Sequence, residues 1–122
     1  MAKILVIDDE REFTEMLAFR LRKQGGYETV EAYDGEAGLK LAESERPEII
    51  LLDVMMPKLD GFEVFQRLKD KPATKSIPVI VLTASVSKDT MDKFTAAGAH
   101  DYVLKPFDAK DLLDKISKVL AR

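Results

Sequence analysis

Five short runs of aliphatic residues recur along the chain and are separated by stretches long enough to form helices. The runs lie at about residues 3–7, 27–33, 48–52, 78–82 and 101–104. Buried parallel strands are near-continuous hydrophobic runs, and strands that alternate with helical patterns indicate βα units. The pattern therefore predicts an α/β fold with five strand–helix repeats and a parallel sheet.

The stretches between the runs carry helical patterns and helix-start signals. Between Arg11 and Gln24 the apolar residues recur at helical spacing, which predicts one buried helix face. The residues of this face are Phe13, Met16, Leu17 and Leu21. Three later helix starts are indicated by Asp34, Asp60 and Asp108, because an aspartate at the N-cap accepts a hydrogen bond from a backbone N–H.

Charged residues stand directly after three of the aliphatic runs. Asp8 and Asp9 follow the first run, Asp53 follows the third, and Lys105 follows the fifth. In open α/β sheets the carboxyl ends of the strands line the crevice where ligands bind, so these side chains converge if their strands are neighbours. Three carboxylates and one ammonium in one pocket point to a hard cation such as Mg²⁺ together with an anion such as a phosphoryl group.

Each of these residues also has a purely structural explanation. Acidic residues such as Asp8 and Asp9 favour the positive N-terminal end of the helix that follows them. Thr83, after the fourth run, has the commoner role of a loop or helix-start residue, and Lys105 resembles an ordinary surface lysine. Asp53 favours the functional interpretation, because its neighbours on both sides are apolar and burying an unpaired charge is costly. A metal ion or a lysine would supply the partner.

Length and charge restrict the possible functions. The 122 residues fit one ordinary domain, so we expect a single domain over residues 1–122. The formal net charge of −3 gives no broad attraction to nucleic acid or to anionic membranes. We find no apolar stretch long enough to span a bilayer and no signal-peptide pattern. The absence of cysteine excludes thiolate chemistry and agrees with a cytoplasmic location.

Several other kinds of site are excluded by what the chain lacks. His100 is the single histidine, so a histidine metal site or a serine–histidine–aspartate triad cannot be assembled, and we expect His100 at the surface. Neither glycine-rich phosphate-loop motif occurs. Four lysines are expected to be solvated, namely Lys69, Lys71, Lys75 and Lys88.

Several short strings occur together in an order typical of one family. They are Asp8-Asp9, Asp53-Val54-Met55-Met56-Pro57 with Gly61 beyond it, Thr83-Ala84, Gly98-Ala99 ahead of Asp101-Tyr102, and Lys105-Pro106-Phe107. With these strings the chain resembles, from end to end, the receiver domain of bacterial two-component response regulators, and in particular the chemotaxis regulators. The resemblance implies a flavodoxin-like, doubly wound parallel sheet with strand order 2-1-3-4-5.

The resemblance also implies a phosphorylation switch and not an enzyme. Asp53 would accept a phosphoryl group from a phosphohistidine of a sensor histidine kinase or a histidine phosphotransfer protein. Mg²⁺ would be held by Asp8, Asp9, Asp53 and the backbone carbonyl of Met55, which neutralises charge on the transferring group.

The same resemblance assigns roles after phosphoryl transfer. Lys105 would pair with phosphoryl oxygens, the Thr83 hydroxyl would donate a hydrogen bond that pulls its loop inward, and Tyr102 would move into the space left behind. The change would be read on the surface of the fourth helix, fifth strand and fifth helix by a downstream output protein or domain.

Two alternative functions remain open from the sequence. A magnesium-dependent phosphohydrolase can use an aspartyl nucleophile on a similar sheet. Such enzymes usually place a second acid two residues after the nucleophile and carry a cap region, whereas Met55 stands at that position and the chain is short. The second alternative is an interaction module that keeps the fold and takes no phosphate.

Overall fold

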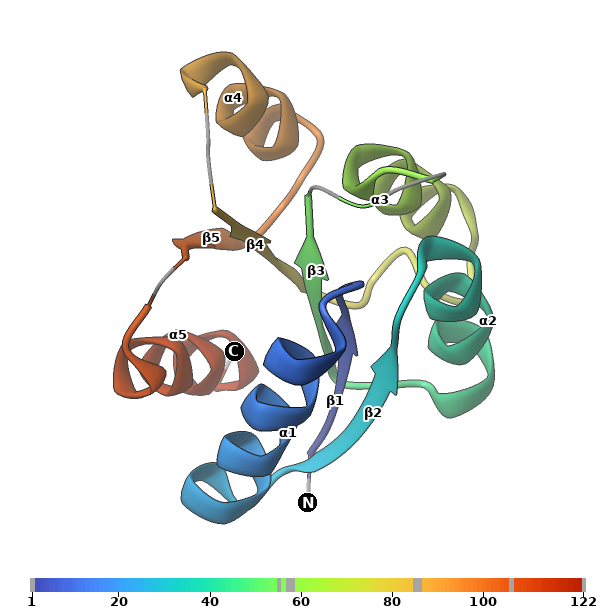
Figure 1. The fold of residues 1–122 in the computed structure, drawn as a ribbon. Helices are drawn as coiled ribbons and strands as arrows, with labels where there is room; N and C mark the ends of the chain where they lie inside the picture. The colour runs from blue at the N-terminus through green and yellow to red at the C-terminus, as the bar shows by residue number, and fades with distance from the viewer. Residues whose placement is uncertain (1, 55, 57–58, 85–86, 106, 122) are drawn as a thin grey trace.

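Strands and helices alternate along the whole chain (Figure 1). The computed structural model describes residues 2–54, 56, 59–84, 87–105 and 107–121. The strands are β1 (Lys3–Ile7), β2 (Glu28–Ala32), β3 (Ile49–Asp53), β4 (Val79–Thr83) and β5 (Asp101–Leu104). The helices are α1 (Arg11–Gly25), α2 (Gly35–Glu45), α3 (Gly61–Asp70), α4 (Lys88–Ala96) and α5 (Ala109–Leu120). Every strand end lies within one residue of the position expected from the sequence.

The five strands form one parallel sheet in the order β2-β1-β3-β4-β5. This is the flavodoxin-like order, and the predicted fold class is therefore confirmed. The strand order reverses between β1 and β3, and ligands in such sheets bind at the carboxyl ends of the strands at this point. The topology thus places the end of β1 beside the end of β3, where Asp8 and Asp53 lie.

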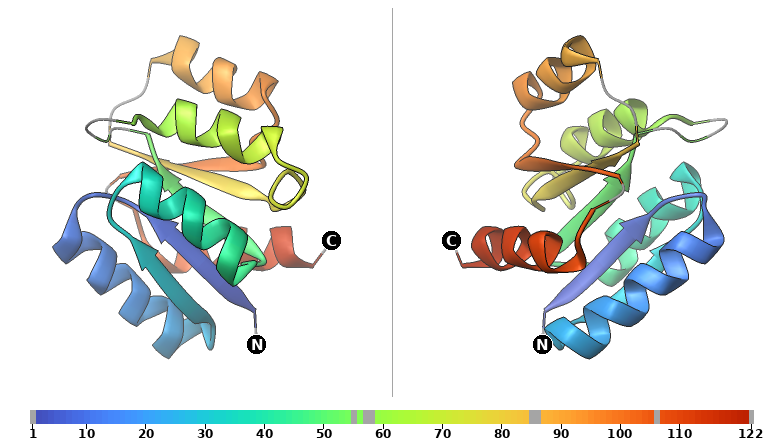
Figure 2. Two further views of the ribbon diagram at one scale, coloured as in Figure 1. Left: turned by 90° about the vertical axis from the view of Figure 1, so that its right-hand side faces the viewer. Right: turned by 60° about the vertical axis from the view of Figure 1, so that its left-hand side comes forward.

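Helices cover both faces of the sheet (Figures 1 and 2). Helices α1 and α5 lie together on one face, whereas α2, α3 and α4 lie on the other side. Alternate residues of the strands enter the two resulting cores: Ile4 and Val6 pack with α1 and α5 residues, whereas Leu5 and Ile7 pack with residues of α2 and α3. No helix formed by the described residues is both long and apolar enough to cross a membrane.

The three aspartates expected to start helices do so. The side chain of Asp34 accepts a hydrogen bond from the Ala37 N–H, and that of Asp60 accepts one from the Glu63 N–H. Asp108 accepts from the Lys110 N–H. These bonds satisfy N–H groups that have no partner within the helix.

The buried face of α1 differs from the predicted one. Met16 is 59% exposed, so its assignment to this face was wrong. The buried positions are spaced by three and four residues from Thr14, and Met16 falls outside this stripe. They are Thr14, Leu17, Ala18 and Leu21. The sequence pattern could not show this, because a polar threonine takes the first position.

Lys69 is also placed differently from the prediction. Lys71, Lys75 and Lys88 are exposed, but Lys69 is half-buried. Its ammonium donates hydrogen bonds to the carbonyl oxygens of Lys75 and Ile77 at 3.1 and 3.3 Å. Burial lowers the pKa of Lys69. The lysine therefore fastens the end of α3 to the segment that leads into β4.

Candidate functional site

Three carboxylates meet at the carboxyl ends of β1 and β3. One oxygen each of Asp8, Asp9 and Asp53 lies within 4.8 Å of the others. Asp8 is fully buried and Asp53 is 4% exposed, whereas Asp9 is more open to solvent. Because like charges at such distances repel one another, this cluster requires a positive partner.

Lys105, directly after β5, supplies positive charge to the cluster. Its Nζ lies 2.6 Å from Oδ2 of Asp8 and 3.6 Å from Oδ1 of Asp53, and only 9% of its side chain is exposed. Burial by itself lowers the pKa of Lys105, but the hydrogen bond to Asp8 and the charges of Asp53 and Asp8 outweigh it and raise the pKa. The lysine is therefore held as an ammonium in the pocket.

The first turn of α1 fixes Asp8. The Glu10 N–H donates to Oδ1 of Asp8 at 3.0 Å, and the Thr14 hydroxyl lies 3.2 Å from the Asp8 carbonyl oxygen and 2.8 Å from that of Glu10. Burial raises the pKa of Asp8, and the hydrogen bonds from Lys105 and Glu10 only partly offset this effect. Asp8 is thus a fixed carboxylate whose negative charge is held at an energetic cost.

Gly61 allows the start of α3 to approach the backbone beside Asp53. Its N–H donates to the Val54 carbonyl oxygen at 3.0 Å. A Cβ atom added to Gly61 would lie 2.6 Å from the Val54 Cα, which is a steric clash with backbone. The glycine of the DVMMP-containing string therefore has a packing role: it closes the loop that follows Asp53.

The donor atoms of the cluster fit a divalent metal of the Mg²⁺ type. Such ions prefer carboxylate and carbonyl oxygens and are commonly held by one or two carboxylates together with phosphate oxygens. Asp8, Asp9 and Asp53 supply these hard oxygens within one ion's reach of each other. Met55, whose carbonyl was the fourth expected ligand, lies outside the described residues.

Thr83 and Tyr102 lie on the two strands beyond β3. Thr83 is fully buried at the end of β4, and its carbonyl oxygen accepts a hydrogen bond from the Lys105 N–H at 2.6 Å. Tyr102 lies on β5 and is 44% exposed. Its side chain lines a cavity of about 440 Å³ between β5 and α4, together with Met91 and Leu104. Thr83 thus adjoins the Lys105 backbone, and Tyr102 lies at the surface.

Two residues near Lys105 escaped the sequence analysis. The Glu10 carboxylate lies 3.2 Å from the Lys105 ammonium, and the Phe13 ring lies 4.2 Å from it. Phe13 was expected only on the buried face of its helix, and Glu10 was not among the expected site residues. The position directly after the Asp8-Asp9 pair was the one available signal for Glu10.

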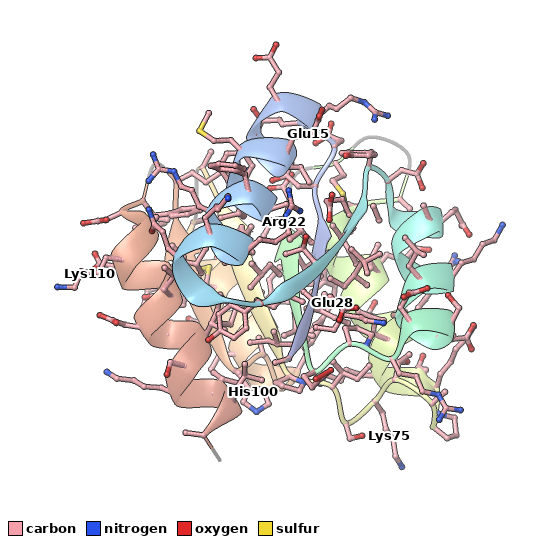
Figure 3. All side chains as sticks on the ribbon, turned by 90° about the horizontal axis from the view of Figure 1, so that it is seen from below. Glu15, Arg22, Glu28, Lys75, His100 and Lys110 are labelled. Carbon is pink, nitrogen blue, oxygen red and sulfur yellow. The ribbon has the colours of Figure 1, made fainter. Side chains whose placement is uncertain are left out.

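His100 lies away from the acidic cluster. Figure 3 shows it on the opposite side of the molecule from Glu15, which is near the end of α1 that borders the cluster. His100 is exposed and its N–H donates to the Val79 carbonyl oxygen at 3.0 Å, at the start of β4. Its predicted surface position is confirmed, and the site contains no histidine among the described residues.

Comparisons with known proteins agree with this arrangement. Residues 4–117 match the family described as "Response regulator receiver domain". The chain is 40% identical to the DNA-binding dual master transcriptional regulator RpaA of Synechocystis over 100% of its own length and 50% of the relative. It is also 40% identical to the alkaline phosphatase synthesis transcriptional regulatory protein PhoP of Bacillus subtilis, over 98% of this chain and 49% of that protein.

A solved structure is similarly close. The chemotaxis protein CheY4 of Vibrio cholerae superposes with a TM-score of 0.91 at 33% identity, and the match covers 98% of each chain. The chain spans about half the length of the curated relatives it matches. By sequence, fold and acidic cluster, the chain therefore belongs to the receiver domains of two-component response regulators, which are signalling modules.

Proposed function

We propose that Asp53 is the phosphoacceptor of a two-component phosphorelay. A carboxylate oxygen of Asp53 attacks the phosphorus of a phosphohistidine on a partner protein, the P–N bond breaks, and the histidine leaves with the bonding electron pair. The product is an acyl phosphate on Asp53. The donor is a sensor histidine kinase or a histidine phosphotransfer protein, and residues 1–122 act as one receiver unit.

The observation that carries this proposal is the convergence of unlike charges around Asp53. Asp53 is the last residue of a central strand, has two further carboxylates beside it, and has the Lys105 ammonium at 3.6 Å. Phosphoryl transfer depends mainly on positioning and on electrostatic stabilisation of the transferring group, so it needs few covalent partners. A fixed carboxylate between a metal site and an ammonium meets this need.

Asp8, Asp9 and Asp53 would hold Mg²⁺, with the Met55 carbonyl as a fourth ligand. When bound, the ion neutralises charge on the phosphoryl oxygens during transfer. The chain's own residues do the rest. Asp8 is fixed by Glu10 and Thr14, and Asp53 is directed from the rigid sheet, so the nucleophile is oriented before the donor arrives.

After transfer, Lys105 and Thr83 act on the phosphoryl group. The Lys105 ammonium pairs with a phosphoryl oxygen, and the Thr83 hydroxyl donates a hydrogen bond to another. The Lys105 N–H donates a hydrogen bond to the Thr83 carbonyl oxygen, so the ends of β4 and β5 respond together. Tyr102 then leaves its exposed position, and the surface of α4, β5 and α5 changes.

The altered surface is recognised by a downstream output protein or domain. The names of the two curated relatives describe transcriptional regulators, each about twice as long as the matched segment. We propose that this chain passes its signal by protein–protein contact, without binding nucleic acid itself or entering a membrane, in the cytoplasm. A net charge of −3 supports the absence of nucleic-acid binding.

The test is phosphorylation by a small donor. Wild-type protein incubated with acetyl phosphate and Mg²⁺ should gain one phosphoryl group in intact-mass spectrometry, and Asp53→Asn should gain none. Asp60→Asn is the matched control, because Asp60 caps α3 outside the cluster. Labelling that persists in Asp53→Asn would refute the assignment.

This labelling experiment and a phosphatase assay together separate the alternatives. A phosphate-independent interaction module would take no phosphoryl group in either protein. An aspartyl phosphohydrolase would release phosphate from a phosphomonoester such as p-nitrophenyl phosphate with many turnovers. The proposed switch predicts a single phosphorylation and no such turnover.

A further inference from the structure

Glu10 is the N-cap residue of α1, and it behaves unlike the N-cap residues of the other described helices. The side chains of Asp34, Asp60, Ser87 and Asp108 each accept a hydrogen bond from the helix that follows. Glu10 makes no such bond. Its carboxylate instead lies 3.2 Å from the Lys105 ammonium, 95 residues away in the chain.

Glu10 is held in place by its backbone. Its N–H donates to Asp8, and its carbonyl oxygen accepts from both the N–H and the hydroxyl of Thr14. Its side chain is 64% exposed, whereas that of Lys105 is 9% exposed. The carboxylate therefore lies at the rim of the pocket and offers Lys105 a partner farther from the buried carboxylates.

The Lys105 ammonium contacts several carboxylates, and it cannot keep all of these contacts when a metal ion binds to the acidic cluster. Its ammonium is closest to Asp8, an expected metal ligand, and a divalent ion there would repel it. The Phe13 ring, 4.2 Å from Nζ and in edge contact with Phe107, provides a second favourable surface on the side of α1. Glu10 and Phe13 thus form an alternative position for the ammonium.

From this geometry we propose that Glu10 is a positioning residue for Lys105. It holds the ammonium at the rim when a metal occupies the carboxylates, and it gives the ammonium up when a phosphoryl group arrives on Asp53. This role for Glu10 rests on the proposed phosphoacceptor function. Glu10 would control how readily the Lys105 ammonium leaves Asp8 and how readily it reaches the phosphoryl group on Asp53.

The proposal predicts opposite effects on two ligands. In Glu10→Gln, Lys105 stays closer to Asp8 and Asp53, so Mg²⁺ should bind about threefold more weakly, as expected for a largely exposed ion pair. The phosphoryl mimic beryllofluoride should bind about threefold more tightly, because Lys105 has lost the competing partner. Glu12→Gln should change neither, since Glu12 is exposed in the same turn and forms no ion pair with the described residues.

A double-mutant cycle separates positioning from a general charge effect. Both affinities are measured by calorimetry for Glu10→Gln in the wild-type background and in a Lys105→Met background. Positioning requires Lys105, so the effects should disappear when Lys105 is absent. Equal changes in both backgrounds would show that Glu10 acts only through its charge, and this result would overturn the proposal. The absence of any change in both backgrounds would also overturn it.

A metal-free measurement makes the proposal testable even if Lys105→Met does not fold. The ¹H–¹⁵N signal of the Lys105 ammonium should be seen in wild type and in Glu12→Gln and should be shifted or broadened in Glu10→Gln. Glu10→Asp should restore part of it. An unchanged signal in Glu10→Gln would overturn the proposal. If wild type bound neither ligand, the phosphoacceptor function itself would have failed, a result distinct from all of these.

Discussion

The Lys105 ammonium lies 2.6 Å from Oδ2 of Asp8, although β3 and β4 separate the strands that these two residues follow. The lysine side chain therefore reaches across the ends of two strands and passes Asp53 on the way. In this way one ammonium offsets part of the repulsion between neighbouring carboxylates. Any metal ion that bound this cluster would have to compete with the lysine for oxygens of Asp8 and Asp53.

Magnesium should raise the melting temperature of the wild-type protein. Binding to the folded state alone stabilises it by about 2.7 kcal/mol when the free ion is at a hundred times its Kd. Asp9→Ala should lose most of this gain, because Asp9 contributes one of the three carboxylates. Differential scanning fluorimetry with and without Mg²⁺ at constant ionic strength measures both. An equal gain in wild type and Asp9→Ala would refute the metal site.

Acid should stabilise the metal-free protein over a limited pH range. Burial raises the pKa of Asp8, so between its ordinary and its raised value the folded state binds more protons than the unfolded state. The free energy of unfolding should therefore rise as the pH falls through this range, relative to that of Asp8→Asn. Urea unfolding at several pH values provides the measurement. A difference between the two proteins that stays constant with pH would contradict the prediction.

Lys105→Ala should separate phosphorylation from switching. Asp53 and the metal ligands remain, so the variant should still gain one phosphoryl group, more slowly than wild type. It should lose the structural response, because the ammonium that connects β5 to the phosphoryl group is absent. Intact-mass spectrometry measures the phosphorylation, and amide chemical shifts measure the structural response. Wild-type switching in this variant would show that Lys105 serves only to stabilise the unphosphorylated pocket.

The response to beryllofluoride should extend over α4, β5 and α5. Thr83 and Lys105 stand at the loops that lead into these elements, and a ligand shifts an equilibrium only through contacts that differ between the two states. Amide shifts should change around Asp53 and along this face, with Tyr102 included, while α1 beyond its first turn changes less. Shifts confined to residues that touch Asp53 would show that the proposed output face is wrong.

Raising the pH should favour the wild-type fold relative to Lys69→Met. Burial lowers the pKa of Lys69, so between its lowered and its ordinary value the unfolded state binds more protons. Stability should therefore increase with pH in this alkaline range. Lys71→Met, at an exposed position, is the control. A comparison of urea midpoints at pH values from 8 to about 10 tests the prediction. Parallel curves for wild type and Lys69→Met would contradict it.

The sequence predicted the features that depend on local pattern. Strand bounds follow from aliphatic runs that are buried on both faces, and helix starts follow from aspartates that cap N–H groups. The convergence of Asp8, Asp53 and Lys105 required one additional fact, the order of the strands, which the family resemblance supplied. With that order, parallel pairing alone brings the strand ends together.

Features that depend on side-chain reach were not predictable. Glu10 and Phe13 lie beside the Lys105 ammonium only because its side chain reaches across the ends of β3 and β4 to the start of α1, which no local pattern encodes. Met16 was misplaced because Thr14 occupies a buried position by bonding to backbone carbonyls. Lys69 was misplaced because its partners are carbonyl oxygens, which have no sequence signature.

The distance of 97 residues between Asp8 and Lys105 in the chain has a consequence for protein synthesis. Asp8, Asp9 and Asp53 are all made in the first half of the chain, whereas their cation comes from the last fifth. A nascent chain that has not yet released Lys105 from the ribosome holds the acidic residues without their counter-charge. The contact between Lys105 and the buried carboxylates can therefore form only after more than four-fifths of these residues have been synthesised.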